Sequence, residues 1–288
     1  MKAWRVHAWG QPPVLEEVPD PQPRAGHTLV RTAAATVAHV DRTVMKGGFL
    51  QPPPLPYTPG VEAAGIVVQS DRFAPGTRVW LRGGGLGTRR DGTWCELIDA
   101  PDEAVGLLPE GVDMALGSAF FSPCTSAWVA LRHVADLQPG ERVGVTGASG
   151  AVGSITRQLA RAWGADLVEA PGVTEPVDLL VDTVGGPVLE QALSAIAPGG
   201  RVVLVGYTAG EQVGLSLPLL MQRDVRLLPL NMYRREAQGR AAAPQLLELL
   251  CDGRLSLATQ RFALAQAAQA LAWIGQRGHR GRAVLAFD

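Results

Sequence analysis

The chain has 288 residues, of which 47% are hydrophobic and 18% charged, and its formal net charge is −1. This mixture is typical of a globular protein that is long enough for two domains, and it argues against a disordered chain. A net charge this close to zero gives no sign of the excess positive charge that binds nucleic acid or an anionic membrane. We therefore expect a small molecule as the main partner, with no nucleic acid and no membrane.

The N-terminal stretch MKAWRVHAWG lacks the long apolar core of a signal peptide, and no apolar run reaches membrane-spanning length. Cys95, Cys124 and Cys251 lie far apart, which is not the spacing of a disulfide framework or a cysteine-rich zinc lobe. We expect a soluble protein of the cytoplasm.

Across residues 2–100, short apolar stretches alternate with Pro and Gly turns, which predicts a β-rich, barrel-like module. The expected strands lie in KAWRVHAW, HTLVRTAAATV, GVEAAGIVVQS, TRVWLR and TWCELIDA. Around Met114 the pattern changes to a helix that is interrupted near Pro123.

From residue 142 onward, nearly continuous apolar strands alternate with helices, which predicts a parallel sheet covered on both faces. The strands are RVGVTGA, DLLVDTVGG, RVVLVGY and VRLLPL, and the helices are GAVGSITRQLARAW and PVLEQALSAIA. The tail predicts two more helices, in APQLLELLCDG and LAQAAQALAWIGQRG, and a final strand in RAVLAF.

The turn from Ala148 to Gly153 follows a strand and opens a helix, as a dinucleotide-binding fingerprint requires. Gly150 would let the backbone approach a pyrophosphate, and Gly153 would permit close packing of the helix. The helix N-terminus would offer free N–H groups and a partial positive charge to the phosphates. Ala148 replaces the first glycine, so a glycine-rich turn without a ligand is the alternative.

Together, the motifs resemble those of the medium-chain dehydrogenase/reductase superfamily, and in particular its zinc-independent quinone oxidoreductase and enoyl reductase branch. The resemblance covers essentially the whole chain. In family order, the matching motifs are PGVEAAGIV, PGTRVW, GTWCELI, GASGAVGS, DTVGG, APGGRVVLVG and RGRAVLAF.

The resemblance implies an α/β plus β protein with two domains and the nicotinamide in the cleft between them. Residues 1–115 and 255–288 would form a chaperonin-10-like β-barrel catalytic domain, and residues 116–254 a Rossmann domain with a doubly wound parallel sheet. The family also implies a homodimer that pairs sheet edges of the cofactor domain, for which VRLLPLNM is the candidate edge.

Zinc-dependent members of the family use Cys, His and Cys as catalytic metal ligands. The matching positions here are Ala38, Val61 and Ser122. Ala and Val cannot coordinate zinc, Ser is a poor substitute for a thiolate, and Glu62 alone does not make a site. We expect no zinc, and without this Lewis acid the natural chemistry is hydride transfer to a quinone or an activated alkene.

Zinc-free relatives often place Asn at the position of Ala38 and Tyr near Thr43, and both are replaced in this chain. The candidate catalytic residues are therefore the remaining polar groups of that loop together with a tyrosine at a strand end: His39, Asp41, Thr43, Lys46 and Tyr207. His39 could protonate a substrate near neutral pH, and Thr43 or Lys46 could bond an enolate oxygen. A purely structural role is the alternative for His39 and Asp41.

The stretch after Gly164 is too short for a full Rossmann half. Only APGVTEP separates the strand residues DLVE from VDLLV, and this link contains two prolines and a glycine. A crossover between parallel strands usually contains a helix. We therefore expect a sheet that lacks about one strand–helix unit on the adenosine side.

The shortened link removes the region in which relatives bind the far end of the cofactor. Glu169 lies slightly early for a ribose-binding acid, Pro171 occupies the better-matching position, and Arg277 is the remaining candidate for a 2′-phosphate. We expect NADP rather than NAD, with reduced affinity. The expected cofactor-binding residues are Ser126, Ala148, Ser149, Gly150, Ala151, Val152, Gly153, Thr183, Val184, Gly206, Tyr207 and Arg277.

The leading functional hypothesis is a zinc-independent, NADP-dependent oxidoreductase that transfers a hydride to a quinone, an enone or a similar activated alkene. Because the Asn, the Tyr and part of the adenosine site are missing, two alternatives stay open. One is a non-redox enzyme that uses the same fold for acid/base or cyclisation chemistry, and the other is a non-catalytic binding protein.

Overall fold

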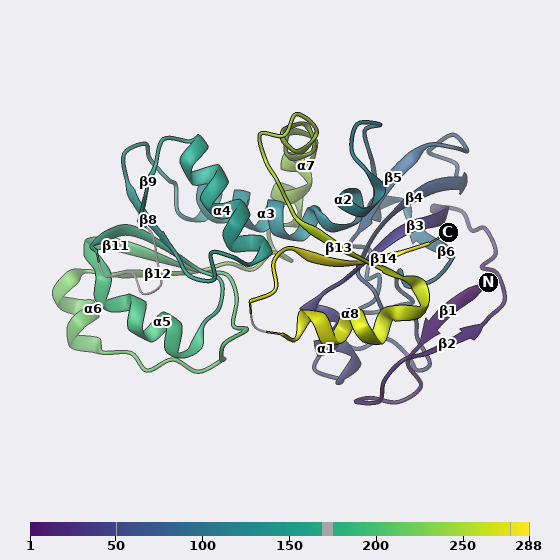
Figure 1. Cartoon of the computed structure of the whole chain (residues 1–288), viewed down its shortest axis with the longest axis horizontal. Coiled ribbons are helices and arrows are strands. Elements are labelled where there is room, and N and C mark those ends of the chain that lie inside the picture. Colours follow the sequence, from purple (N-terminus) through teal and green to yellow (C-terminus); the bar gives the residue numbers. More distant parts are fainter. Residues whose placement is uncertain (50, 169–174, 277, 288) are drawn as a thin grey trace. The chain divides into compact units, whose positions relative to one another are not determined.

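The computed structural model describes residues 1–49, 51–168, 175–276 and 278–287. Its contacts divide the chain into two compact units (Figure 1). Unit 1 consists of Met1–Phe121 and Ala258–Asp288, and unit 2 of Ser122–Leu257. The first division falls six residues after the expected boundary at 115/116, because helix α2 (Met114–Ala119) packs against strands of unit 1. The second falls three residues after the expected boundary at 254/255.

Unit 1 is built around a seven-stranded sheet in which β13, β14, β3, β4, β5 and β7 are neighbours and β6 also pairs with β3. A separate ribbon pairs β1 with β2. The strands are β1 (Lys2–Arg5), β2 (Val14–Glu17), β3 (His27–Val37), β4 (Glu62–Gln69), β5 (Arg78–Arg82), β6 (Leu97–Pro101), β7 (Val105–Leu107), β13 (Thr259–Ala263) and β14 (Arg282–Ala286).

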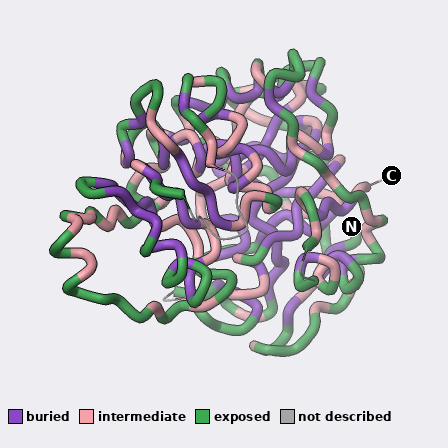
Figure 2. Tube along the Cα trace, turned by 60° about the vertical axis from the view of Figure 1, so that its left-hand side comes forward, coloured by how far each residue is buried: buried purple, intermediate pink, exposed green. Residues whose placement is uncertain are grey.

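The long strand β3 is the centre of this sheet, since it pairs with β14, β4 and β6. Most of its residues are buried, and Figure 2 shows long buried stretches of the chain separated by exposed loops. Helices α1 (His39–Met45) and α8 (Ala267–Ile274) supply further core residues, among them Val44 and Ala270. The C-terminal strand β14 therefore completes a sheet begun at the other end of the sequence, as the family resemblance implies.

Unit 2 contains a five-stranded parallel sheet in the order β12-β11-β10-β8-β9. Its strands are β8 (Arg142–Val145), β9 (Asp166–Val168), β10 (Val177–Asp182), β11 (Ile196–Leu204) and β12 (Arg226–Pro229). Figure 1 shows α4 (Ala151–Ala162) on one side of this sheet, with α5 (Gly186–Ala192) and α6 (Leu217–Arg223) on the other. The doubly wound fold is confirmed.

The shortened half of the sheet is also confirmed. In a six-stranded doubly wound sheet, the order is 3-2-1-4-5-6. In unit 2, β9 forms the edge next to β8, and the chain reaches β10 on the far side of β8 within eight residues. The described residues between β9 and β10 form no further strand or helix.

Several elements differ from the sequence-based expectations. The expected helix after Met114 is interrupted at Phe120, and α3 (Phe121–Val129) follows it. Pro123 lies in the first turn of α3, where its missing N–H removes no hydrogen bond of the helix. A π-helical turn, Ala130–Val134, extends α3. Helix α7 (Glu236–Cys251) begins seven residues before the expected start at Ala243, with Pro244 inside it. Five short elements, β2, α1, β7, α6 and β13, were not expected, because their patterns are too short to show a period.

Candidate active site

The strand ends of unit 2 carry one group of candidate residues. β8 leads into the turn from Thr146 to Gly150, β10 into Thr183 and Val184, and β11 into Gly206 and Tyr207. Because these strands are parallel and adjacent, the three turns lie at one edge of the sheet. The structure thus brings together the expected residues Ala148, Thr183, Val184 and Gly206.

A buried carboxyl joins two of these turns. Asp182 accepts hydrogen bonds from the Thr146 hydroxyl (2.5 Å) and from the backbone N–H of Gly185 (2.9 Å). The Thr183 hydroxyl in turn donates to the Thr146 carbonyl (2.8 Å). The side chain of Asp182 is inaccessible to solvent, and this burial raises its pKa above the ordinary value. Asp182 therefore fixes the shape of the turn, a role that the sequence did not reveal.

Two glycines of the turn are required by its geometry. Gly147 has φ +62°, and a Cβ on it would overlap the Thr183 hydroxyl. A Cβ on Gly153 would overlap the carbonyl oxygen of Gly147. Glycine at position 153 therefore lets helix α4 pack closely against the turn that precedes it. Gly147 was not among the expected site residues, although its position directly after a strand and Thr146 could have indicated it.

Gly150 is the N-cap of α4 and has no side chain to bond the first N–H groups of the helix. A Cβ on Gly150 would meet only the Gly147 carbonyl oxygen, at 3.2 Å. The N–H groups of the first helical turn have no partner within the helix. The expected residues Ala151 and Val152 lie in this turn, and their N–H groups are the donors that a pyrophosphate would use.

The other expected cofactor-binding residues differ in their surroundings. Ser126 is half-buried on α3, and Ser149 lies in the turn before α4. Tyr207 is 63% exposed at the end of β11, which leaves its hydroxyl accessible. Arg277, Glu169 and Pro171 lie outside the described residues.

The expected catalytic residues of unit 1 lie on or next to α1. His39 is exposed at the start of the helix, with its ring centroid 6.2 Å from that of His279. The pKa of His39 is lowered mainly by desolvation and further by the positive charge of neighbouring groups, among them His279 and Arg42. The Thr43 hydroxyl donates to the His39 carbonyl (3.3 Å), and Lys46 is exposed at the C-cap. A neutral His39 at physiological pH accepts a proton more readily than it donates one.

Asp41 lies beneath this surface and is 1% exposed. Its Oδ2 accepts the backbone N–H of Ala38 (2.7 Å), which caps α1, while its Oδ1 is buried without a hydrogen-bond partner. Burial is the main cause that raises the pKa of Asp41, to about 7. Asp41 therefore caps α1 from a buried position, which corresponds to the structural alternative that the sequence left open.

A cluster of charged side chains adjoins Asp41. Glu62, 1% exposed, forms ion pairs with Arg282 of β14 and with Arg82 of β5 (3.9 Å). Glu62 and Arg82 are cross-strand partners, so the register of β4 and β5 sets this pair. Neither arginine was expected from the sequence, although charges at the facing ends of two expected strands could have indicated Arg82.

The positions that match zinc ligands hold no metal-binding side chains in unit 1. Ala38 and Val61 are buried and apolar, and Glu62 is engaged by the two arginines. Among the described residues, no group of three or more His, Cys, Asp or Glu side chains is arranged to hold a metal ion.

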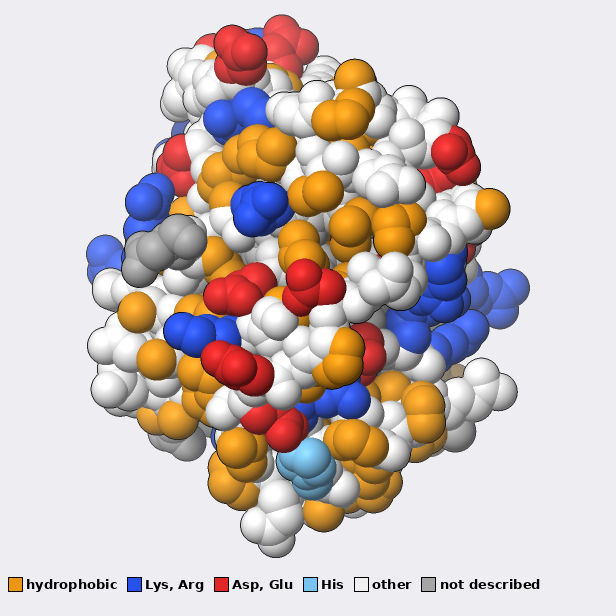
Figure 3. Space-filling view, turned by 90° about the vertical axis from the view of Figure 1, so that its right-hand side faces the viewer, with side chains coloured by type: hydrophobic (Ala, Val, Ile, Leu, Met, Phe, Trp, Pro, Cys, Tyr) orange, Lys and Arg blue, Asp and Glu red, His pale blue; other side chains and the backbone are white. Residues whose placement is uncertain are grey.

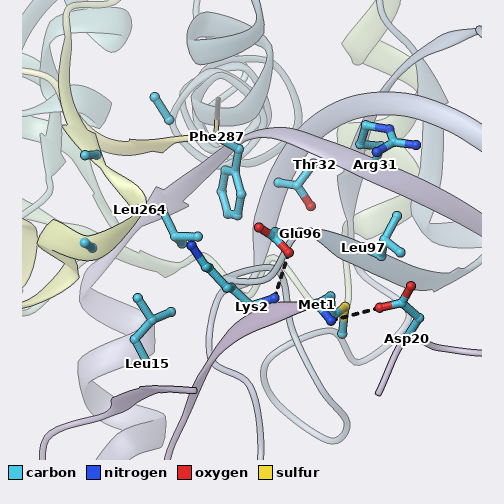
Figure 4. Close-up of a pocket in the computed structure, with 13 residues that line it drawn as sticks. Met1, Lys2, Leu15, Asp20, Arg31, Thr32, Glu96, Leu97, Leu264 and Phe287 are labelled. Atoms are coloured by element: carbon cyan, nitrogen blue, oxygen red, sulfur yellow. Dashed lines mark hydrogen bonds and ion pairs between the residues drawn. The ribbon is translucent and has the colours of Figure 1, made fainter. Parts of the chain in front are cut away.

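Unit 1 also contains a cavity of about 710 Å³ that includes none of the expected site residues (Figure 4). In this cavity the Lys2 N–H donates to Glu96 (2.7 Å) and the amino terminus to Asp20 (2.9 Å). Phe287, Leu264, Leu15 and Leu97 supply its apolar walls.

Comparisons with known proteins agree with this architecture. Residues 24–110 match the alcohol dehydrogenase GroES-like domain, and residues 164–285 match the zinc-binding dehydrogenase family. The quinone oxidoreductase of Sus scrofa is 30% identical over 285 residues, which cover 85% of each chain. The chain belongs to the medium-chain dehydrogenase/reductase superfamily.

Within this superfamily, the quinone oxidoreductase of Pseudomonas aeruginosa is 29% identical and covers 96% of this chain and 97% of its own. The solved quinone oxidoreductase of Thermus thermophilus, studied also in complex with NADPH, is 26% identical with a TM-score of 0.80 and covers both chains completely. The expected family and fold are confirmed, and the chain is an oxidoreductase.

Proposed function

We propose that this chain is a zinc-independent, NADPH-dependent reductase of quinones, enones or similarly activated alkenes. The observation that carries the proposal is the turn at Gly150, which caps α4 without a side chain and where an added Cβ would meet only the Gly147 carbonyl oxygen. The first N–H groups of α4 have no partner within the helix. This turn fits the pyrophosphate of a nicotinamide dinucleotide. The quinone oxidoreductase relatives, one of them studied with NADPH, support the same cofactor class.

When bound, the cofactor would supply a hydride from its nicotinamide ring. The residues of this chain would then bind and orient the substrate and supply the proton. The turns at Thr183 and Gly206 would contact the cofactor where it crosses the ends of the strands. Tyr207 is exposed, and its hydroxyl could donate a hydrogen bond to a substrate. In unit 1, His39, Thr43 and Lys46 would offer hydrogen bonds to the substrate oxygen as negative charge develops there.

The side chains at the matching positions support the proposed zinc independence. Ala38 and Val61 offer no lone pair to a metal, and the Glu62 carboxylate already bonds a guanidinium. The preference for NADP over NAD rests on the family resemblance and on Arg277.

The first experiment is a titration with NADPH followed by nicotinamide fluorescence, and then stopped-flow oxidation with a panel of quinones and enones. We expect binding below the millimolar range and oxidation of NADPH by at least one substrate class. Binding without oxidation by any substrate would favour the non-redox enzyme, and no binding at all would contradict the proposal and leave a protein without redox function.

We also propose a homodimer in the cytoplasm, with the edge strand β12 at the interface. Met221, 79% exposed, and Leu217, 65% exposed, lie on the neighbouring helix α6. On the face shown in Figure 3, by contrast, charges of both signs lie among the hydrophobic side chains. No helix in the described part of the chain has the length and apolar character needed to cross a membrane.

If α6 and β12 form the interface, Met221→Asp should weaken the dimer at least about tenfold, because it buries a charge without a partner. Sedimentation velocity over a concentration series measures this. Val14, an exposed residue of β2 in unit 1, gives the matched control V14D, which should leave the dimer intact. A wild-type chain that sediments as a monomer at all concentrations would disprove the dimer.

A further inference from the structure

The cavity of unit 1 lies where two strands separate on one edge of β3. β14 pairs with residues 34–37 of β3 and β6 with residues 27–31, while β4 pairs along the other edge. The register with β4 shifts between Thr32 and Ala34, which indicates a β-bulge at the junction of β14 and β6. A bulge bends its strand, so it separates the end of β14 from the start of β6. Residues from both strand ends line the cavity.

The backbone at this junction already has hydrogen-bond partners. The Phe287 N–H donates to the Ala33 carbonyl (3.1 Å), and the Thr32 N–H donates to the Glu96 carbonyl (2.9 Å). The Glu96 N–H in turn donates to the Lys2 carbonyl of the β1–β2 ribbon (3.1 Å). A peptide that adds as a strand needs a free sheet edge. The cavity therefore suits a small molecule, and its volume of about 710 Å³ lies within the range of such sites.

The charged groups of the cavity include two cations without a partner. The amino terminus is paired with Asp20, and this hydrogen bond raises the pKa of the amine, so these two charges balance. The side chains of Lys2 and Arg31 are exposed and form no hydrogen bond or ion pair with any residue that the structure describes. Glu96 is the remaining anion, and it accepts the Lys2 backbone N–H. The excess of positive charge favours an anionic ligand.

Apolar side chains form much of the remaining wall. Figure 4 shows Leu15, Leu264 and Phe287 on the left of the cavity and Leu97 on the right. Each of these four residues is only half-buried, so part of its apolar surface is in contact with water. A ligand that covers this surface removes it from water, which favours binding. The cavity thus fits a molecule that carries a negative charge on an apolar body.

We propose that this cavity is a second binding site of unit 1, which takes a small carboxylate with an aliphatic chain. Lys2 and Arg31 attract the carboxylate, and the chain of the ligand packs against the apolar walls. None of the candidate active-site residues lines the cavity, so this site is separate from the residues assigned to hydride transfer. Because the lining includes Met1 and Phe287, near the two ends of the sequence, a bound ligand should also stabilise unit 1.

Octanoate is the probe, and isothermal titration calorimetry on the untagged chain is the measurement. We expect one saturable site with a dissociation constant below about 1 mM. From hexanoate to octanoate, the affinity should rise about fourfold with each added CH₂ group that the walls bury. Octylamine has an alkyl chain of similar length but a positive charge, so it should bind at least several-fold more weakly than octanoate.

Arg31→Gln and Lys2→Gln should each weaken octanoate binding about two- to fivefold, because an exposed charge contributes modestly to an ion pair. The double variant should lose roughly tenfold. Both side chains are exposed, so the variants should fold as the wild type does. Arg89→Gln, at an exposed arginine of unit 1 outside the cavity, is the matched control and should bind octanoate with the wild-type affinity.

The proposal would be overturned if octanoate binding does not saturate, if octylamine binds as tightly as octanoate, or if the double variant binds octanoate normally. Competition between octanoate and NADPH would also overturn it, because the ligand would then occupy the cofactor site. If octanoate binds as expected but no quinone or enone is reduced, the cavity site stands and the reductase function fails. If a quinone or enone is reduced but octanoate does not bind, the reductase function stands and the cavity site fails.

Discussion

Gly150→Asp should abolish the binding of NADPH. The substitution places a carboxylate beside the unpaired N–H groups of α4, where a pyrophosphate would otherwise bind. The repulsion between this carboxylate and a phosphate charge about 4 Å away costs about 1 kcal/mol in water and about 4 kcal/mol near a protein surface. The side chain also fills space that the pyrophosphate would occupy. We expect the dissociation constant to rise roughly 100-fold or more in a fluorescence titration.

Gly199→Asp is the matched control for this experiment. Gly199 lies within β11 of the same unit, and a Cβ on it would contact no atom within 4 Å. Its φ of +76° strains most side chains, although Asp adopts this region more often than most residues, so circular dichroism first checks that the variant folds. The Gly199→Asp substitution adds the same charge at another glycine and does not alter the turn at Gly150. The dissociation constant for NADPH should therefore stay within about twofold of the wild-type value. Normal binding by Gly150→Asp would show that the cofactor does not use this turn.

Asp182→Ala should strongly destabilise the protein. The substitution leaves the Thr146 hydroxyl and the Gly185 N–H without their acceptor in a place that water does not reach. Each unsatisfied buried group costs about 1 to 3 kcal/mol, so the loss in the free energy of unfolding should be about 3 to 5 kcal/mol in total. Urea denaturation followed by tryptophan fluorescence would measure it.

Glu211→Ala is the reference for this loss. Glu211 is an exposed acidic residue of the same unit, and its removal should change the free energy of unfolding by less than about 0.5 kcal/mol. Asp182→Ala should also weaken NADPH binding, because the turn at Thr146 loses its anchor. Stability equal to that of Glu211→Ala would disprove the role of Asp182 in holding the turn.

The parts of the fold that the sequence predicts are those with a repeating local pattern. The strand β8, the turn at Gly150 and the helix α4 follow from apolar runs and glycines within about 20 residues, and the shortened link to β10 follows from its length and prolines. The short helix α1 was not predicted, because seven residues are too few to show a helical period and its cap is the buried side chain of Asp41.

The candidate site divides in the same way. The sequence by itself determined the superfamily, the trimmed sheet and the loss of zinc ligands at Ala38 and Val61, since each depends on which residue stands in a local motif. Only the tertiary structure decided that Glu62 bonds Arg282, 220 residues away, and that Asp182 supports the turn. These contacts depend on strand register and burial, and two charges distant in the sequence leave no local pattern that predicts their meeting.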